Sequence, residues 1–161
     1  MSFHFGHLNP VRVSNKPPTF ARIGALFCIA VFLTVPLDAE QSTAVVARDA
    51  WVRLPAASKT QTALYVVFEN HSSEKRKAVS AICDVAQTAE MHEMTMTRAM
   101  MVMAPVSEVS IPAKGKRSLD PNGYHLMLFG LKTKLAVGDV VHATFTLDDG
   151  STVPVTATVR K

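Results

Sequence analysis

Cysteine is nearly absent from this chain of 161 residues, which holds only Cys28 and Cys83. Cys28 lies in an apolar N-terminal segment that we expect to be removed, and this would leave Cys83 alone. A single cysteine forms no intramolecular disulfide and cannot supply the cysteine pairs of common zinc motifs. A disulfide-stabilised scaffold is therefore excluded, and stability must come from a hydrophobic core.

A strong charge of one sign is also missing. Of the 17 basic and 13 acidic residues, three basic residues and one acid fall within residues 1–39, so that 14 and 12 remain and the net charge is +2. Aromatic residues make up 7% of the chain and are not interleaved with a basic stripe. Binding to nucleic acid through phosphate neutralisation is therefore not indicated.

Signatures of catalysis are lacking too. The sequence shows no Ser-His-Asp ordering, no paired carboxylates beside a cleft signal, no glycine-rich phosphate loop and no metalloprotease helix motif. We therefore interpret the protein as a non-enzyme.

Long hydrophobic runs are limited to one, Ile23–Leu37, of 15 residues. A transmembrane helix needs about 20. Basic residues precede the run and the small-residue sequence LDAEQ follows it, which is the pattern of a secretory signal peptide. We predict a signal over residues 1–39 and an exported domain over residues 40–161, with an uncleaved anchor as the alternative. Phe27, directly before Cys28, argues against a lipoprotein cleavage site.

The remaining sequence has the pattern of an all-β domain. Short runs rich in β-branched residues alternate with turn sequences, and Asp148-Asp149-Gly150 predicts a hairpin. Pro154 indicates an edge position, because proline cannot donate a ladder hydrogen bond. We predict an antiparallel Greek-key β-sandwich. Its expected strands are residues 45–55, 62–70, 77–83, 99–106, 123–131, 139–147 and 151–159.

Methionine is concentrated in one segment, Met91–Met103, which holds six of the eight methionines of the chain. Methionine usually fills gaps in a core, and we expect packing or loop positions for the four residues Met91, Met94, Met96 and Met100. Met101 shares strand parity with Met103 and could be a spare sulfur near it.

A second notable segment is Tyr124–Leu128, YHLML. The alternation of a strand places His125 and Met127 on one face and Leu126 and Leu128 on the other. If the leucines face the core, an imidazole and a thioether are left exposed together. Such a pair suits a metal ligand set better than a core.

Two imidazoles and two thioethers complete the candidate site: His92, Met103, His125 and Met127. Thioethers prefer a soft monovalent ion, so this donor set indicates Cu(I) over zinc, magnesium or calcium. The set lacks the thiolate of a blue-copper centre, so we expect holding and release of copper and not redox cycling. Glu90 or Glu93 could orient His92.

With these residues the sequence resembles the periplasmic copper chaperones of the PCuAC type. Their signature is His, ten residues, Met, twenty-one residues, His, one residue, Met, and His92, Met103, His125 and Met127 match it without a gap. Flanking segments such as AEMHEM and IPAKGKRSLDPNGYHLMLFGLK are similar as well, and the resemblance covers roughly residues 45–159.

The resemblance implies a cupredoxin-like β-sandwich that binds one Cu(I) through those four side chains. It further implies copper homeostasis and cytochrome c oxidase assembly as the role, with the copper-bearing oxidase subunit and a thioredoxin-like copper protein as partners. The C-terminal sequence TVRK carries no histidine or methionine, so we do not expect the second copper site of some relatives.

Other readings stay open. The same four residues would serve a copper-storage or resistance protein without a dedicated client. A plain β-sandwich interaction module would use the methionines as a docking patch, and copper would not affect it. We expect His71 and His142 to be ordinary surface or hydrogen-bonded histidines, and Cys83 to be a buried strand thiol.

Overall fold

The computed structural model describes residues 44–98 and 100–161, so the predicted signal segment lies outside it. The described residues form ten strands, and no helix among them is long and apolar enough to cross a membrane. The strands are β1 (Val45–Arg53), β2 (Gln61–Asn70), β3 (Arg76–Cys83), β4 (Thr88–Thr97), β5 (Met100–Pro105), β6 (Val109–Ile111), β7 (Lys116–Leu119), β8 (Tyr124–Phe129), β9 (Val140–Leu147) and β10 (Thr152–Arg160).

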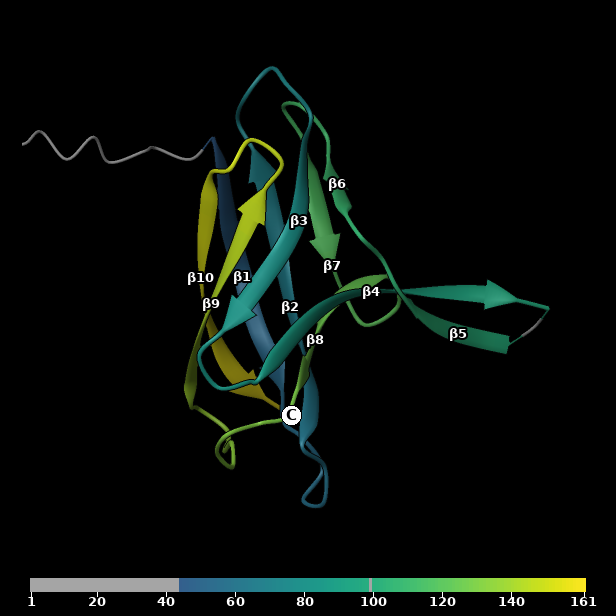
Figure 1. The fold of residues 1–161 in the computed structure, drawn as a ribbon, viewed down its shortest axis with the longest axis vertical. Coiled ribbons are helices and arrows are strands. Elements are labelled where there is room, and N and C mark those ends of the chain that lie inside the picture. The colour runs from purple at the N-terminus through teal and green to yellow at the C-terminus, as the bar shows by residue number, and fades with distance from the viewer. Residues whose placement is uncertain (1–43, 99) are drawn as a thin grey trace, which may run out of the picture. The chain divides into compact units, whose positions relative to one another are not determined.

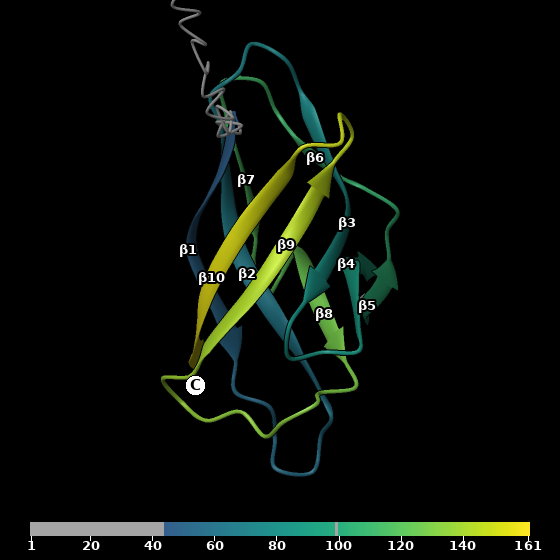
Figure 2. The ribbon, with the colours of Figure 1, turned by 60° about the vertical axis from the view of Figure 1, so that its left-hand side comes forward.

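The strands form one hydrogen-bonded path in the order β5-β4-β8-β2-β1-β10-β9-β3-β6, with β7 paired to β2 beside β8. This path curls around a common core in two layers (Figures 1 and 2). The predicted all-β class is confirmed. The pairing of β1 with β10 is parallel, and the other pairs are antiparallel. A hairpin would make two paired strands antiparallel. β1 and β10 are the first and last strands and are not joined by a hairpin, so they can pair in parallel.

The core lies between strands that are distant in sequence. Phe68 of β2 meets Phe145 of β9 edge to face, with ring centroids 4.9 Å apart. Both strands of the C-terminal hairpin alternate buried and exposed residues, as a sheet with one covered face does. Fully burying a large apolar side chain contributes about 1.5–3 kcal/mol, so this cluster supplies the stability that disulfides do not.

All seven predicted strands are present, with ends shifted by one or two residues, and three further strands were not predicted. β6 and β7 are only three and four residues long. β4, TAEMHEMTMT, is rich in glutamate and methionine, which do not favour strands. It is a strand because β8 pairs with its first half and β5 with its second half.

Pro154 lies within β10, a strand with neighbours on both sides. β9 pairs with β10 along Thr152–Thr158, whereas β1 pairs only with Thr158–Arg160. Pro154 is therefore at an edge locally, although its strand is internal in the sheet order. The missing N–H removes no ladder bond to β1.

An irregularity in β1 determines which residues face outward at the candidate site. The register with β2 shifts between Arg48 and Trp51, and Asp49 adopts a positive φ of 51°. An inserted residue of this kind reverses the alternation of the strand. Val45 and Val52 consequently both point into the core, and Trp51 points to the opposite face of the sheet, beside Tyr65.

The hairpin of β4 and β5 projects from the body of the domain (Figure 1). β8 pairs with β4 only from Thr88 to Glu93, and the hairpin continues outward from there through the pairs between β4 and β5. The first ligand candidate, His92, lies where the hairpin leaves the sheet.

Candidate metal centre

His92 and His125 are direct cross-strand partners on β4 and β8. Their ring centroids are 6.1 Å apart, with the planes tilted by 44°. Directly opposite residues of an antiparallel pair extend to the same face, so the sheet itself brings the two imidazoles together. Residues 33 positions apart in the sequence therefore share one location.

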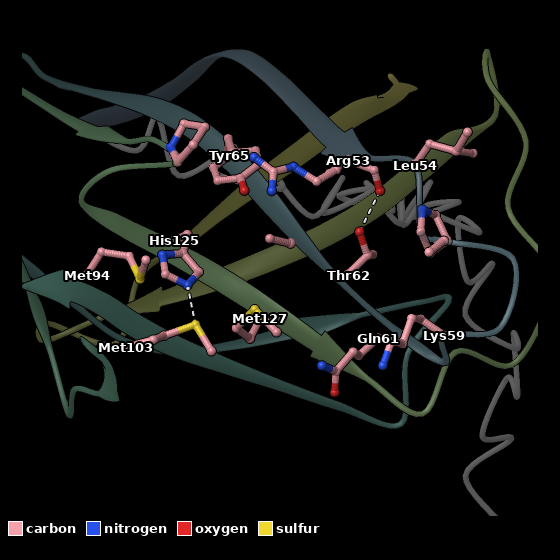
Figure 3. Close-up of a pocket in the computed structure, with 14 residues that line it drawn as sticks. Arg53, Leu54, Lys59, Gln61, Thr62, Tyr65, Met94, Met103, His125 and Met127 are labelled. Atoms are coloured by element: carbon pink, nitrogen blue, oxygen red, sulfur yellow. Dashed lines mark hydrogen bonds between the residues drawn. The ribbon is translucent and has the colours of Figure 1, made fainter. Parts of the chain in front are cut away.

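Hydrogen bonding defines the tautomer of His125. Its Nδ1–H donates to the Gly123 carbonyl at 3.0 Å. Nε2 then carries the lone pair, and it lies 3.2 Å from Sδ of Met103 (Figure 3). Two electron-pair donors thus face each other with no proton between them, an arrangement that a cation would stabilise.

His92 has a comparable free nitrogen. Nε2 of His92 lies 3.2 Å from a carboxylate oxygen of Glu90, which fixes the ring. Nδ1 is buried and has no hydrogen-bond partner among residues 44–98 and 100–161. An unpartnered buried polar atom costs stability unless something binds it, so this nitrogen suits a metal. Of the two glutamates considered from the sequence, Glu90 contacts His92, whereas Glu93 hydrogen-bonds to Tyr124.

The two methionine candidates lie beside His125. Met127 follows it on β8 after one residue, and Met103 reaches it from β5. Both thioethers line a pocket of about 270 Å³, together with His125 and Met94 (Figure 3). The four residues of the predicted site are therefore neighbours in the structure.

The exposure of this site differs from the expectation. His125 and Met127 do share one face, with Leu126 and Leu128 on the other, but they are not exposed. Their exposed fractions are 4% and 7%, and that of His92 is 7%. On the outer face of β8, Met127 and Phe129 pack with Ala63, Tyr65 and Trp51 in a second, small apolar cluster. Of the four residues only Met103, at 46%, reaches solvent.

Burial is the main cause that lowers the pKa of His125 from its ordinary value. The charges of His92 and Arg53 act in the same direction, whereas the hydrogen bond to Gly123 and the carboxylate of Asp120 oppose them. The imidazole is therefore neutral at neutral pH, the form that binds metals. Among residues 44–98 and 100–161, no three His, Cys, Asp or Glu side chains group in a way that could hold a metal ion.

Sequence reasoning missed Met94. It was expected to pack or to lie in a loop, yet it is the cross-strand partner of Met103 and lines the same pocket. Period-two spacing from His92 would have placed it on that face, had β4 been predicted as a strand.

Met91, Cys83 and the two remaining histidines of the described residues lie where the sequence predicted them. Met91 is 5% exposed and packs in the main core, as expected for a gap filler. Cys83 is buried as predicted, and burial raises the pKa of its thiol. His71 and His142 are exposed and lie outside the centre.

Comparison with solved structures defines the class of the domain. The fold is the cupredoxin-like fold of PCuAC domains. Apo DR1885 from Deinococcus radiodurans is 31% identical, with a TM-score of 0.58 over 98% of this chain and 97% of that chain. Its Cu(I)-bound form is 38% identical, with a TM-score of 0.54 over 70% and 75%. The copper-bound PCuAC domain from PmoF2 has a TM-score of 0.59 over 71% and 90%, and its 18% identity shows the fold alone.

Sequence comparison then gives the family. The family model described as "Putative lipoprotein LpqE-like" matches residues 45–159. A "Putative lipoprotein" from Leifsonia xyli subsp. xyli is 34% identical over 122 residues, which is 75% of this chain and 72% of that protein. The chain therefore belongs to the LpqE-like family. Its structural neighbours include PCuAC domains, the type whose His-Met spacing the sequence resembles.

Proposed function

We propose that this protein is an exported copper chaperone, not an enzyme, that holds one Cu(I) ion through His92, Met103, His125 and Met127. The observation that carries the proposal is the contact of His125 Nε2 with Met103 Sδ at 3.2 Å, in which neither atom has a proton to share. The unpartnered Nδ1 of His92 supplies a third donor. Met127, in the same pocket, supplies a fourth.

The chemistry of this donor set selects the ion. Thioether and imidazole ligands favour soft Cu(I), and no carboxylate or thiolate is part of the set. The relative from Deinococcus radiodurans that is 38% identical was solved as a Cu(I) complex, which supports the same cargo here. Thioethers need no deprotonation, so binding depends only on the two imidazoles being neutral.

Delivery is the second part of the proposal. We infer that the loaded protein acts in the periplasm, consistent with relatives named as lipoproteins, and passes copper to the copper-bearing subunit of cytochrome c oxidase beside a thioredoxin-like copper protein. Because Met103 is the exposed ligand, an acceptor reaches the ion there first. Transfer then proceeds by ligand exchange at this side of the site.

A competition titration tests the copper site. Wild-type protein is titrated with a Cu(I) chelator under anaerobic conditions, beside His125→Gln and a matched control, His142→Gln. His142 is an exposed histidine on β9 outside the centre, so its replacement should leave the affinity unchanged. His125→Gln should weaken binding by more than about tenfold, since even loss of a residue that only supports a ligand typically costs that much. Equal affinities for all three proteins would contradict the assignment.

A transfer assay tests the client. The loaded protein is mixed with a purified oxidase copper domain, and the copper content of both is measured after separation. Rapid stoichiometric transfer supports the chaperone. Retention of copper would favour the alternative, a storage or resistance protein built on the same site.

A further inference from the structure

The projecting hairpin carries a double row of methionines. Met94 and Met96 lie on the same face of β4 as His92, because they follow it at intervals of two. The register pairs Met94 with Met103 and Met96 with Met101 across to β5. Side chains of such partners point to one face, with Cβ atoms about 4.5–5.5 Å apart. We call these four residues the thioether ladder, with an inner rung, Met94 and Met103, and an outer rung, Met96 and Met101.

The inner rung is continuous with the metal centre. Met94 and Met103 line the pocket that holds His125 and Met127, and both side chains extend beside the His125 imidazole (Figure 3). The outer rung lies farther along the arm, where Met96 is 68% and Met101 49% exposed. The ladder therefore connects solvent with a centre whose other three ligands are buried.

Packing in the core does not explain the presence of Met96 and Met101. Met91, on the opposite face of the same strand, is buried in the core, whereas the outer rung covers no part of it. An exposed methionine contributes little hydrophobic stabilisation. Four thioethers in register, ending at a set of soft donors, are explained by affinity for a soft cation.

We propose that the thioether ladder is a second Cu(I) site, a transient one, through which the ion enters and leaves the four-ligand centre. The inference rests on the proposed function and adds a route to it. Copper binds first at Met96 and Met101, passes to Met94 and Met103, and is captured by the imidazoles. At entry the Cu–S bonds to the outer rung replace bonds to the copper donor, and Cu–S bonds to the inner rung then replace those to the outer rung. At the centre, Cu–N bonds to His92 and His125 form and the Cu–S bond to Met94 breaks. Copper stays monovalent throughout, and no proton moves because the thioethers and the receiving imidazole nitrogens carry none. Met103 belongs to both sites and links them.

The test compares the double variant Met96→Leu/Met101→Leu with the control Met100→Leu. Leucine retains size and apolar character but removes the sulfur. Met100 lies on the same hairpin and is 65% exposed, but it is on the opposite face of β5 from Met101 and Met103. Stopped-flow uptake of Cu(I) from a chelator complex should slow by about tenfold in the double variant, equivalent to about 1.4 kcal/mol of barrier. The control should match the wild type, and the equilibrium affinity of all three proteins should agree.

Carbon-13 spectra of the methionine methyl groups give a readout independent of rate. Cu(I) added beyond one equivalent should shift the methyl resonances of Met96 and Met101 and leave that of Met100 in place. Unchanged uptake in the double variant, or equal slowing in the control, would overturn the ladder while leaving the centre intact. If the wild type takes up no copper at its histidines, the proposed function fails instead, and methyl shifts confined to the ladder would still support a soft-metal site there.

Discussion

Replacement of Met127 by leucine separates the metal role of this residue from its packing role. Met127 is 93% buried, in the small cluster with Ala63 and Tyr65. Leucine has a similar volume, so the free energy of unfolding of the copper-free protein should change by less than about 1.5 kcal/mol. Truncation to alanine would cost about 2–5 kcal/mol and confuse the two roles.

The loss of a thioether ligand should appear only when copper is present. A ligand that binds the native state stabilises it by RT ln(1 + [L]/Kd), so a hundredfold weaker Kd removes about 2.7 kcal/mol of copper-induced stabilisation. For a domain of this size, 1 kcal/mol shifts Tm by about 4 °C. Thermal unfolding with saturating Cu(I) should therefore show a copper-induced rise in Tm that is smaller by about 10 °C in Met127→Leu.

Met91→Leu is the matched control, because it makes the same exchange in the main core on the opposite face of the sheet. It should keep the full copper-induced rise in Tm. The reasoning is refuted if Met127→Leu keeps that rise as well, or if both variants lose it equally.

Three further outcomes follow from the structure. Glu90→Gln should weaken Cu(I) binding by about 10–100-fold in a chelator competition, because Glu90 orients His92; an unchanged affinity would exclude that role. Cys83 should resist alkylation at pH 8 until the protein is unfolded, since burial raises the pKa of its thiol; fast labelling of native protein would contradict this. Hydrogen bonds from Ser151 lower the pKa of Asp149. This carboxylate therefore stabilises the fold above its unfolded pKa, and that contribution is lost as pH falls through the folded value. Asp149→Asn should flatten the loss of stability in urea titrations below about pH 4, and an unaltered slope would refute it.

The main strands could be predicted from the sequence, and so could the face of β8 on which each side chain lies, because period-two alternation is a local property. Leu126 and Leu128 face the core as expected. The sequence predicted that His92 and His125 come close together, but not that they are direct cross-strand partners. That pairing depends on strand register, which is set by contacts across the whole sheet.

Other features depended on contacts that a single sequence does not display. β4 was missed because its glutamates and methionines have weak strand preference, and two neighbouring strands override it. The outward face of β8 was expected to be exposed, but a register shift in β1 turns Trp51 to that face of the sheet, where it packs against the cluster of Tyr65 and Met127. Such an irregularity has no clear signal in the residues around Asp49.

X-ray absorption at the copper edge of the Cu(I)-loaded protein tests the central proposal most directly. It counts the nitrogen and sulfur neighbours of the ion. We expect two nitrogen and two sulfur neighbours in the wild type at one equivalent of copper, and one sulfur fewer in Met127→Leu. A shell of nitrogen or oxygen alone, or a sulfur count that Met127→Leu leaves unchanged, would contradict the assignment of this centre.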